Sequence, residues 1–333
     1  MAVARPSIYT TCPELDGGQP RSIIRRVVET ARWCESLGHD GMLIRSSNRL
    51  VDPWVIAQLL LHETESLRPV VTVQPLYMHP YAVAKKVATL AHVYGRSPDL
   101  YLVAGGSNTD LLSLDDRVAH DDRYRRLTEY VEVITALLTA HRPITHVGEC
   151  YRIYKPAALA PLADEQKPRF FMATCSRAGR RAAQDLGALS VSSLGLGEGA
   201  DCILLGLVVR GSSEEAWGVA RARFPTDAAE RLAHGLDMAW SDSSWNERLG
   251  GLANSHALNS DGLWLGPFEN RQSRSPYLVG DTRTAVRGLQ DALSAGARIF
   301  FLEPPHCRAD VEQASEAIER AWTRSQSPLT LTG

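Results

Sequence analysis

The feature that most constrains the fold of this chain is a regular alternation of short apolar runs with longer amphipathic runs. SIYTT (7–11), VVTV (70–73) and LYLV (100–103) have the β-branched or continuously apolar character of strands, the last of the kind buried on both faces of a parallel sheet. Residues 21–37 place apolar side chains at helical spacing, and Gly38 follows as a stop signal. This alternation predicts strand-helix units that form a parallel sheet.

Local signals mark where several of the predicted helices begin. Asp52 is expected to cap a helix with Pro53 in its first turn, Ser212 or Ser213 to cap a second, and Asp281 or Thr282 to cap a third. Roughly eight strands, each followed by a helix, predict an α/β chain with a (β/α)8 TIM barrel whose active site lies at the carboxyl ends of its strands. An open doubly wound sheet is the alternative, but no GxGxxG follows the first strand.

Two stretches depart from the alternation. In residues 141–156, two β-rich runs flank Gly148, which predicts an inserted surface hairpin. Residues 226–274 begin with a helix-like run to Trp240 and continue in a segment rich in Ser, Asn and Gly, which predicts a long mobile loop that serves as an active-site lid. With both insertions included, we expect residues 1–333 to form a single barrel domain.

Composition narrows the class of partner. The chain has 36 basic and 38 acidic residues and no basic block, which argues against a nucleic-acid partner. No apolar run reaches about 18 residues and the N-terminus lacks a secretory signal, so we expect no membrane association. The six cysteines have no CxxC spacing and the histidines no HExxH or HxH pattern, so we expect reduced thiols, a cytoplasmic location and no metal site.

Several blocks in the same order resemble the bacterial-luciferase-like flavin-dependent monooxygenases, and among these the alkanesulfonate monooxygenases most closely. The resemblance runs over nearly the whole chain. Its blocks are SLGHDGMLIRSSNRLVDPWVIAQ (36–58), LYLVAGG (100–106) with Asn108, AHDDRYRRLTEYVEVI (119–134), GLVVRGSSEEAW (206–217), GLWLG (262–266), Arg271 and LVGDTRTAV (278–286).

This resemblance implies a barrel enzyme that receives reduced FMN from a separate flavin reductase and uses oxygen to oxidise a small organic substrate. It also implies a homodimer or homotetramer. Two alternatives remain open on the same scaffold: a deazaflavin-dependent oxidoreductase that transfers hydride without oxygen, and a flavin-free or non-catalytic barrel that binds a ligand or serves as an accessory subunit.

Flavin contacts are expected at strand ends and helix starts. Gly105 and Gly106 would let a planar ring approach the backbone closely, with the side chains of Asn108 and Gln74 at polar edges of the ring. Cys175 and Ser176 open a helix whose free N–H groups favour a phosphate. By the resemblance, His120 and Tyr124, four residues apart on one helix face, also contact the flavin.

Arg271 matches an arginine that the alkanesulfonate enzymes place on a mobile segment closing over flavin and substrate. Arg271 and His120 are therefore the predicted catalytic residues. Other positions depart from that family: its Arg-x-His pair is replaced by Leu204 and Gly206, its tryptophan by Leu194 and its cysteine by Leu50. Because a buried sulfonate would lack its partners, the sequence favours a substrate other than a simple alkanesulfonate.

Overall fold

The computed structural model describes residues 4–14, 20–105, 107–156, 159–196, 199–254 and 262–326. The predicted Gly106 contact lies outside these residues. The chain divides into two compact units. Unit 1 comprises Met1–Pro13, Trp33–Asp40 and Val191–Gly333, and unit 2 comprises Glu14–Arg32 and Gly41–Ser190.

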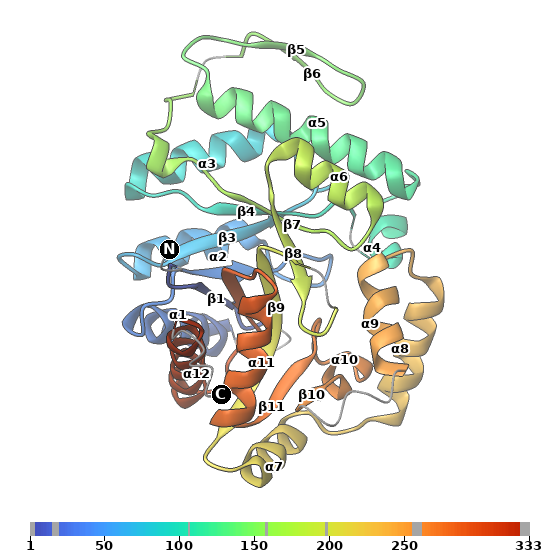
Figure 1. Cartoon of the computed structure of the whole chain (residues 1–333). Helices are drawn as coiled ribbons and strands as arrows, with labels where there is room; N and C mark the ends of the chain where they lie inside the picture. The colour runs from blue at the N-terminus through green and yellow to red at the C-terminus, as the bar shows by residue number, and fades with distance from the viewer. Residues whose placement is uncertain are drawn as a thin grey trace, which may run out of the picture. The chain divides into compact units, whose positions relative to one another are not determined.

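The strand order confirms the predicted fold class. Eight parallel strands follow one another as β1-β2-β3-β4-β7-β8-β9-β12, and β12 pairs again with β1, which is the order of a closed (β/α)8 barrel (Figure 1). The strands are β1 (Ser7–Thr11), β2 (Gly41–Ile44), β3 (Arg68–Val73), β4 (Asp99–Leu102), β7 (Phe170–Ala173), β8 (Leu189–Ser193), β9 (Cys202–Arg210) and β12 (Ile299–Leu302).

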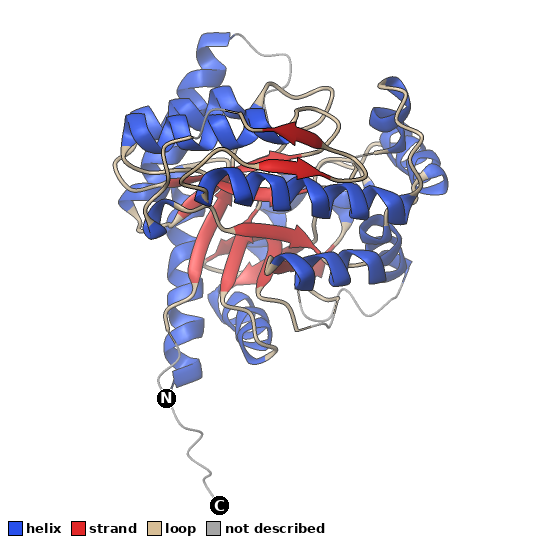
Figure 2. Ribbon diagram, turned by 90° about the horizontal axis from the view of Figure 1, so that it is seen from above, coloured by secondary structure: helices blue, strands red, loops and turns tan. Residues whose placement is uncertain are grey.

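The helices between these strands begin at residues that the sequence marks. Asp52, Ser212 and Asp281 accept hydrogen bonds from the first-turn N–H groups of α2, α7 and α11, as predicted. Figure 2 shows helices packed along the strands. The main helices are α1 (Pro20–Ser36), α2 (Pro53–Glu63), α3 (Pro80–Tyr94), α5 (His120–Thr139), α6 (Arg177–Leu186), α7 (Ser213–Arg223), α11 (Thr282–Ser294) and α12 (Arg308–Gln326).

Unit 2 contains the inserted hairpin that the sequence predicts. Strands β5 (Thr145–Val147) and β6 (Arg152–Tyr154) pair antiparallel, and in Figure 1 they lie beyond α5. Glu129 of α5 holds the hairpin, because its carboxylate contacts His146 Nε2 at 3.0 Å and accepts from the main-chain N–H groups of Cys150 and Tyr151. Burial works against ionisation of Glu129, yet these bonds hold its pKa below the ordinary value.

In unit 1, the two halves of strand β9 pair with different strands. Its first half pairs with β12 and β8, whereas Gly206 to Arg210 pairs in parallel with β11 (Tyr277–Asp281). One face of β9, including Leu205 and Val209, packs into a core built with α11 and α12. The strand therefore extends past the barrel and supports an additional β-structure at its carboxyl end.

In the segment 226–274, the helix-like run expected up to Trp240 is confirmed as α8 (Ala228–Trp240). The loop expected after it is wrong in part, because the structure shows α9 (Ser244–Asn254), β10 (Leu263–Trp264) and α10 (Gly266–Glu269). Strand β10 pairs antiparallel with β11, and Leu249, Leu265 and Phe268 form a small core between α9 and α10. Few apolar residues are buried here, so the Ser- and Gly-rich sequence gives no clear pattern for α9, β10 and α10.

A buried chain of hydrogen bonds links the end of β1 to α12 in unit 1. Thr10 Oγ lies 2.8 Å from His39 Nδ1, and His39 Nε2 lies 2.8 Å from Ser315 Oγ. Ser315 donates its own proton to Val311 O, so Nε2 must carry the ring proton and Nδ1 must accept from Thr10. Burial, together with the charge of Arg5, lowers the pKa of His39 to about 4.

All six cysteines are free thiols. Cys150 in unit 2 and Cys307 in unit 1 are exposed, Cys175 is half-buried, and the other three are buried.

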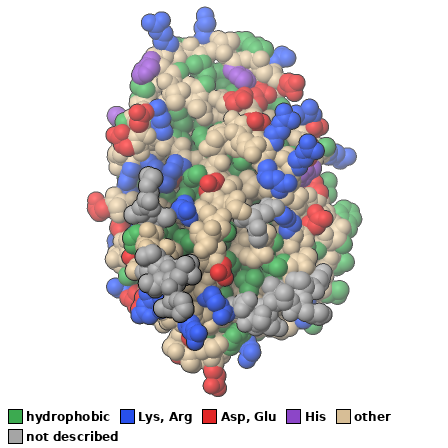
Figure 3. Space-filling model, viewed as in Figure 1, with side chains coloured by type: hydrophobic (Ala, Val, Ile, Leu, Met, Phe, Trp, Pro, Cys, Tyr) green, Lys and Arg blue, Asp and Glu red, His purple; other side chains and the backbone are tan. Residues whose placement is uncertain are grey.

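On the face drawn in Figure 3, acidic and basic side chains are interspersed, in keeping with the even balance of charge in the sequence.

Candidate functional site

The amino end of α6 forms a small polar cradle in unit 2. Ser176 caps the helix by accepting from the Gly179 N–H at 2.9 Å, and Cys175 precedes it at the carboxyl side of β7. A Cβ on Gly179 would lie 3.1 Å from Ser176 Oγ and 3.2 Å from the Tyr124 hydroxyl. The missing side chain thus leaves room for two hydroxyl groups beside the positive end of a helix, a geometry suited to a phosphate.

His120 and Tyr124 share one face of α5, as predicted. Their ring centroids are 5.2 Å apart in an edge-on arrangement. His120 Nδ1 lies 2.7 Å from Asp121 Oδ1, so a carboxylate already engages one of its ring nitrogens. The structure brings Tyr124 to the α6 cradle, and the flavin contacts predicted for both residues stay predictions.

The remaining predicted contacts of unit 2 follow β3 and β4. Gln74 is buried and comes directly after β3, at the carboxyl end where ligands of such barrels bind. Asn108 is the first residue of α4 (Asn108–Ser113), so it lies at the start of a helix. At Gly105, a Cβ would lie 3.0 Å from the side chain of Arg123, so the packing of Arg123 explains this glycine without a ligand.

Sequence reasoning missed a polar cluster that joins the loops after β2, β3 and β4. The Tyr77 hydroxyl donates to Asn48 Oδ1 at 2.6 Å, and Asn48 Nδ2 donates to Ser113 Oγ at 2.5 Å. Burial and the charge of Asp110 raise the pKa of Tyr77, while a hydrogen bond with Gln74 opposes them. Only their positions in the sequence could have indicated these residues, because Asn48 and Tyr77 each lie within four residues of the end of a strand.

Unit 1 shows what occupies the positions of the family's Arg-x-His pair. Leu204 is buried in β9, and Gly206 lies against the ring of Tyr277, its partner in β11. A Cβ on Gly206 would be 2.3 Å from a carbon of that ring, so Tyr277 fills the space that a side chain would need. An imidazole at position 206 and Tyr277 in its present rotamer are mutually exclusive.

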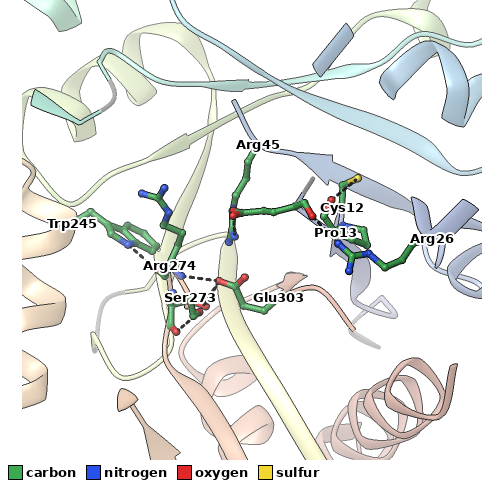
Figure 4. A network of polar contacts seen from close by, with 10 residues as sticks. Cys12, Pro13, Arg26, Arg45, Trp245, Ser273, Arg274 and Glu303 are labelled. Carbon is green, nitrogen blue, oxygen red and sulfur yellow. Dashed lines mark hydrogen bonds and ion pairs between the residues drawn. The ribbon is translucent and has the colours of Figure 1, made fainter. Parts of the chain in front are cut away.

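Next to Gly206, the residue after β12 contributes a buried carboxylate. Glu303 N–H donates to Leu205 O at 2.9 Å, and Glu303 Oε1 accepts from Ser275 Oγ at 2.7 Å, Ser273 Oγ at 3.2 Å and Arg274 N–H at 3.3 Å (Figure 4). The His306 ring packs edge-on against Phe224, and its main-chain N–H donates to Asp310.

Arg271, the predicted lid arginine, faces α8. Its guanidinium lies 3.3 Å from Asp237 and 3.5 Å from Glu230, two carboxylates on α8. Its backbone is in the left-handed region at φ 59°. The catalytic role predicted for Arg271 stays a prediction, but the structure shows that its charge ties the segment before β11 to that helix.

The described part of the chain holds neither a metal-binding cluster nor a membrane-spanning helix. No group of three His, Cys, Asp or Glu side chains in this part of the chain is arranged to hold a metal ion. None of the described helices is long and apolar enough to cross a membrane.

Comparison with known proteins identifies the family. The family model described as luciferase-like monooxygenase matches residues 7–299. The chain belongs to the luciferase-like monooxygenase family. As a luciferase-like enzyme, it is a flavin-dependent monooxygenase with the barrel described above.

Curated and solved relatives extend over almost the whole chain. The 4-(gamma-L-glutamylamino)butanoyl-[BtrI acyl-carrier protein] monooxygenase BtrO of Niallia circulans is 25% identical over 315 residues, covering 90% of this chain and 92% of that protein. EDTA monooxygenase EmoA of Chelativorans sp. BNC1 superimposes with a TM-score of 0.72 at 16% identity and covers 99% and 96% of the two chains. The oxygenating constituent of 3,6-diketocamphane monooxygenase of Pseudomonas putida, in complex with FMN, gives 0.71 at 15% identity over 98% and 99%.

Proposed function

We propose that this luciferase-like monooxygenase uses reduced FMN and oxygen to oxidise a small organic substrate that is not a simple alkanesulfonate. The α6 cradle is the observation that carries the cofactor assignment. Tyr124 and Ser176 place two hydroxyl groups over Gly179 at a helix amino end, and this arrangement suits the FMN phosphate. The residues present therefore fit the cofactor.

Bound reduced flavin would supply the electrons that activate oxygen. The protein's own contribution is to hold and orient it. Ser176 and Tyr124 would bind the phosphate, while Gln74, Asn108, His120 and Cys175 are the further proposed contacts of unit 2. The Tyr77–Asn48–Ser113 cluster would fix the loop after Gln74 and the helix α4 that begins at Asn108, which limits their motion during the reaction.

The replaced residues support an unusual substrate. Leu204 and Gly206 offer neither a positive charge nor a proton, and Tyr277 occupies the space beside Gly206. Leu194 packs against an apolar core, and Leu50 likewise lacks a polar group. The resemblance to alkanesulfonate enzymes thus extends to the family blocks and not to the sulfonate-binding side chains.

The names of the relatives are compatible with varied substrates, since one is an acyl-carrier-protein monooxygenase and another an EDTA monooxygenase.

We further propose that a separate flavin reductase delivers the FMN, that the enzyme works in the cytoplasm, and that it assembles as a homodimer or homotetramer. The segment 226–274 would act as the active-site lid, now as a helical element. A single-domain organisation over residues 1–333 is proposed with it.

Anaerobic titration tests the cofactor. We expect the protein to bind reduced FMN in the micromolar range typical of transferred cofactors and to consume oxygen in a reductase-coupled assay. Tight binding of reduced deazaflavin with none of reduced FMN would establish the hydride-transferring alternative instead. Binding of neither cofactor would favour the non-catalytic barrel.

A further inference from the structure

Two arginines precede β11, and their guanidinium groups differ in their contacts. Arg271 is paired with Glu230 and Asp237. Arg274, three residues later, has an exposed side chain whose guanidinium contacts no carboxylate, carbonyl or ring within the described part of the chain. Arg271 is thus committed to α8, while Arg274 carries a charge that other described residues leave available.

The backbone of Arg274 is fixed on both sides. Its N–H donates to Glu303 Oε1 at 3.3 Å, and its carbonyl accepts from Trp245 Nε1 of α9 at 3.0 Å. The hydroxyl groups of Ser273 and Ser275 bind the same carboxylate oxygen. Three consecutive residues are therefore anchored to the end of β12, which removes much of the backbone entropy that a loop arginine would lose on binding.

The Glu303 carboxylate anchors the backbone of Arg274 and not its side chain. Glu303 is a carboxylate next to an arginine, yet it binds the arginine's main-chain N–H and not its guanidinium. Figure 4 shows the Arg274 side chain running away from Glu303, on the side of the ring of Trp245. Three main-chain and hydroxyl donors bind Glu303 Oε1, so the carboxylate holds the backbone of Arg274 in place and leaves its guanidinium charged.

Arg274 is anchored near the strand positions where Leu204 and Gly206 replace the family's cationic pair. Glu303 follows β12 directly, Gly206 lies in the neighbouring β9, and Gly206 N–H donates to Pro276 O at 2.9 Å. Arg274 is thus tied to the carboxyl ends of the two strands where the family's cationic pair is absent. Carboxyl strand ends are where barrels of this type bind substrate.

From these observations we propose that Arg274 binds a carboxylate group of the substrate, with Glu303 as its positioning residue. A guanidinium offers two parallel N–H groups that match the planar oxygens of a carboxylate. The assignment rests on the proposed monooxygenase function for the identity of the ligand as substrate. It extends that function by naming the substrate class as organic acids held by a single arginine.

Paired probes of equal chain length test the proposal by isothermal titration calorimetry on the whole protein. Wild-type protein is expected to bind octanoate more tightly than octan-1-ol, and Arg274→Gln to weaken octanoate binding by about tenfold or more with little change for the alcohol. Arg320→Gln, which removes an exposed arginine of α12 paired with Glu316, is the matched loss of charge and should retain the preference. Arg271→Gln tests the rival arginine, because loss of the preference in Arg271→Gln and not in Arg274→Gln would assign the carboxylate to Arg271.

Two substitutions of Glu303 test its positioning role with the same probes. Glu303→Gln keeps an oxygen acceptor for the three donors and should preserve most of the octanoate preference, whereas Glu303→Ala should lose it although Arg274 is intact. Thermal unfolding of each variant separates this loss from misfolding. The proposal is overturned if wild type binds both probes equally, if Arg274→Gln keeps the preference, or if Arg271→Gln alone abolishes it.

Reduced-FMN affinity distinguishes the two possible sources of an anionic group. If Arg274→Gln weakens reduced FMN as strongly as octanoate, the guanidinium binds the cofactor phosphate and the substrate assignment fails. If wild type binds no reduced FMN but still prefers octanoate, the proposed function fails while the carboxylate site remains.

Discussion

The ring of Tyr277 covers the Cα of Gly206, so closely that a Cβ at this glycine would lie 2.3 Å from a ring carbon. The two residues are partners in the β9–β11 register. We therefore expect Gly206→His, which restores the residue type of the alkanesulfonate enzymes, to lower the free energy of unfolding by about 1–3 kcal/mol through overpacking. Urea titration measures the change.

A companion variant makes this prediction sharper. Tyr277→Ala removes the obstructing ring, so Gly206→His should be less damaging in the Tyr277→Ala background than in wild type. Equal losses in both backgrounds would mean that another neighbour opposes the imidazole.

The α6 cradle predicts a phosphate-dependent effect on cofactor binding. Tyr124→Phe and Ser176→Ala should each weaken reduced-FMN binding by about 0.5–2 kcal/mol because each removes a polar contact. Reduced riboflavin, which has no phosphate, should bind wild type and variants alike. Unchanged affinity for reduced FMN in both variants would place the phosphate site elsewhere.

Ser176 also caps α6, so its substitution has a structural component. Ser176→Gly is the suitable control, because glycine at a helix N-cap costs only a few tenths of a kcal/mol relative to serine, while alanine costs about 1 kcal/mol. A similar loss of reduced-FMN affinity in both variants would assign the effect to the hydroxyl group and not to fraying of the helix.

Arg271 links its segment to α8 through two carboxylates. We expect Arg271→Ala to reduce turnover more than reduced-flavin affinity, because freeing α8 would impair closure of the proposed lid. Steady-state kinetics and an anaerobic flavin titration supply the two numbers. Glu230→Gln combined with Asp237→Asn leaves the guanidinium but removes its partners, and should reproduce the fall if anchoring of α8 is the cause.

His39 predicts a decline of stability in mild acid. Its folded-state pKa of about 4 lies below the ordinary 6.5, so the unfolded chain binds an extra proton between these values. The contribution is complete above pH 6.5, is lost as pH falls towards 4, and amounts to about 3 kcal/mol at most. Denaturant unfolding at pH 7.5, 5.5 and 4.5 should show this slope in wild type and a shallower slope in His39→Gln.

Much of the barrel was predictable because its signals are local. The strand Ser7–Thr11 matches its predicted limits, and Asp52, Ser212 and Asp281 cap the expected helices, since apolar runs and capping side chains act within a few residues. The segment after Trp240 was less predictable. Helix α8 fits the helix-like run expected up to that residue, but α9, β10 and α10 that follow are short, so each carries little periodic signal.

The candidate site was predictable only in part, for a related reason. Ser176 and Tyr124 could be located from a helix start and a four-residue spacing. The contacts of Glu303 with Ser273 and Ser275 join residues 28 and 30 positions apart, and the Tyr277 ring meets Gly206 across two strands. Such contacts depend on strand register, which a single sequence does not specify.

The two exposed thiols are separated by the division of the fold, with Cys150 in unit 2 and Cys307 in unit 1. Burial and the nearby Glu129 carboxylate raise the pKa of Cys150, which slows its alkylation relative to an ordinary thiol. Sequential labelling with a donor and an acceptor dye is therefore practicable without introducing new cysteines. Energy transfer between the dyes would report directly on any motion of one unit against the other during turnover.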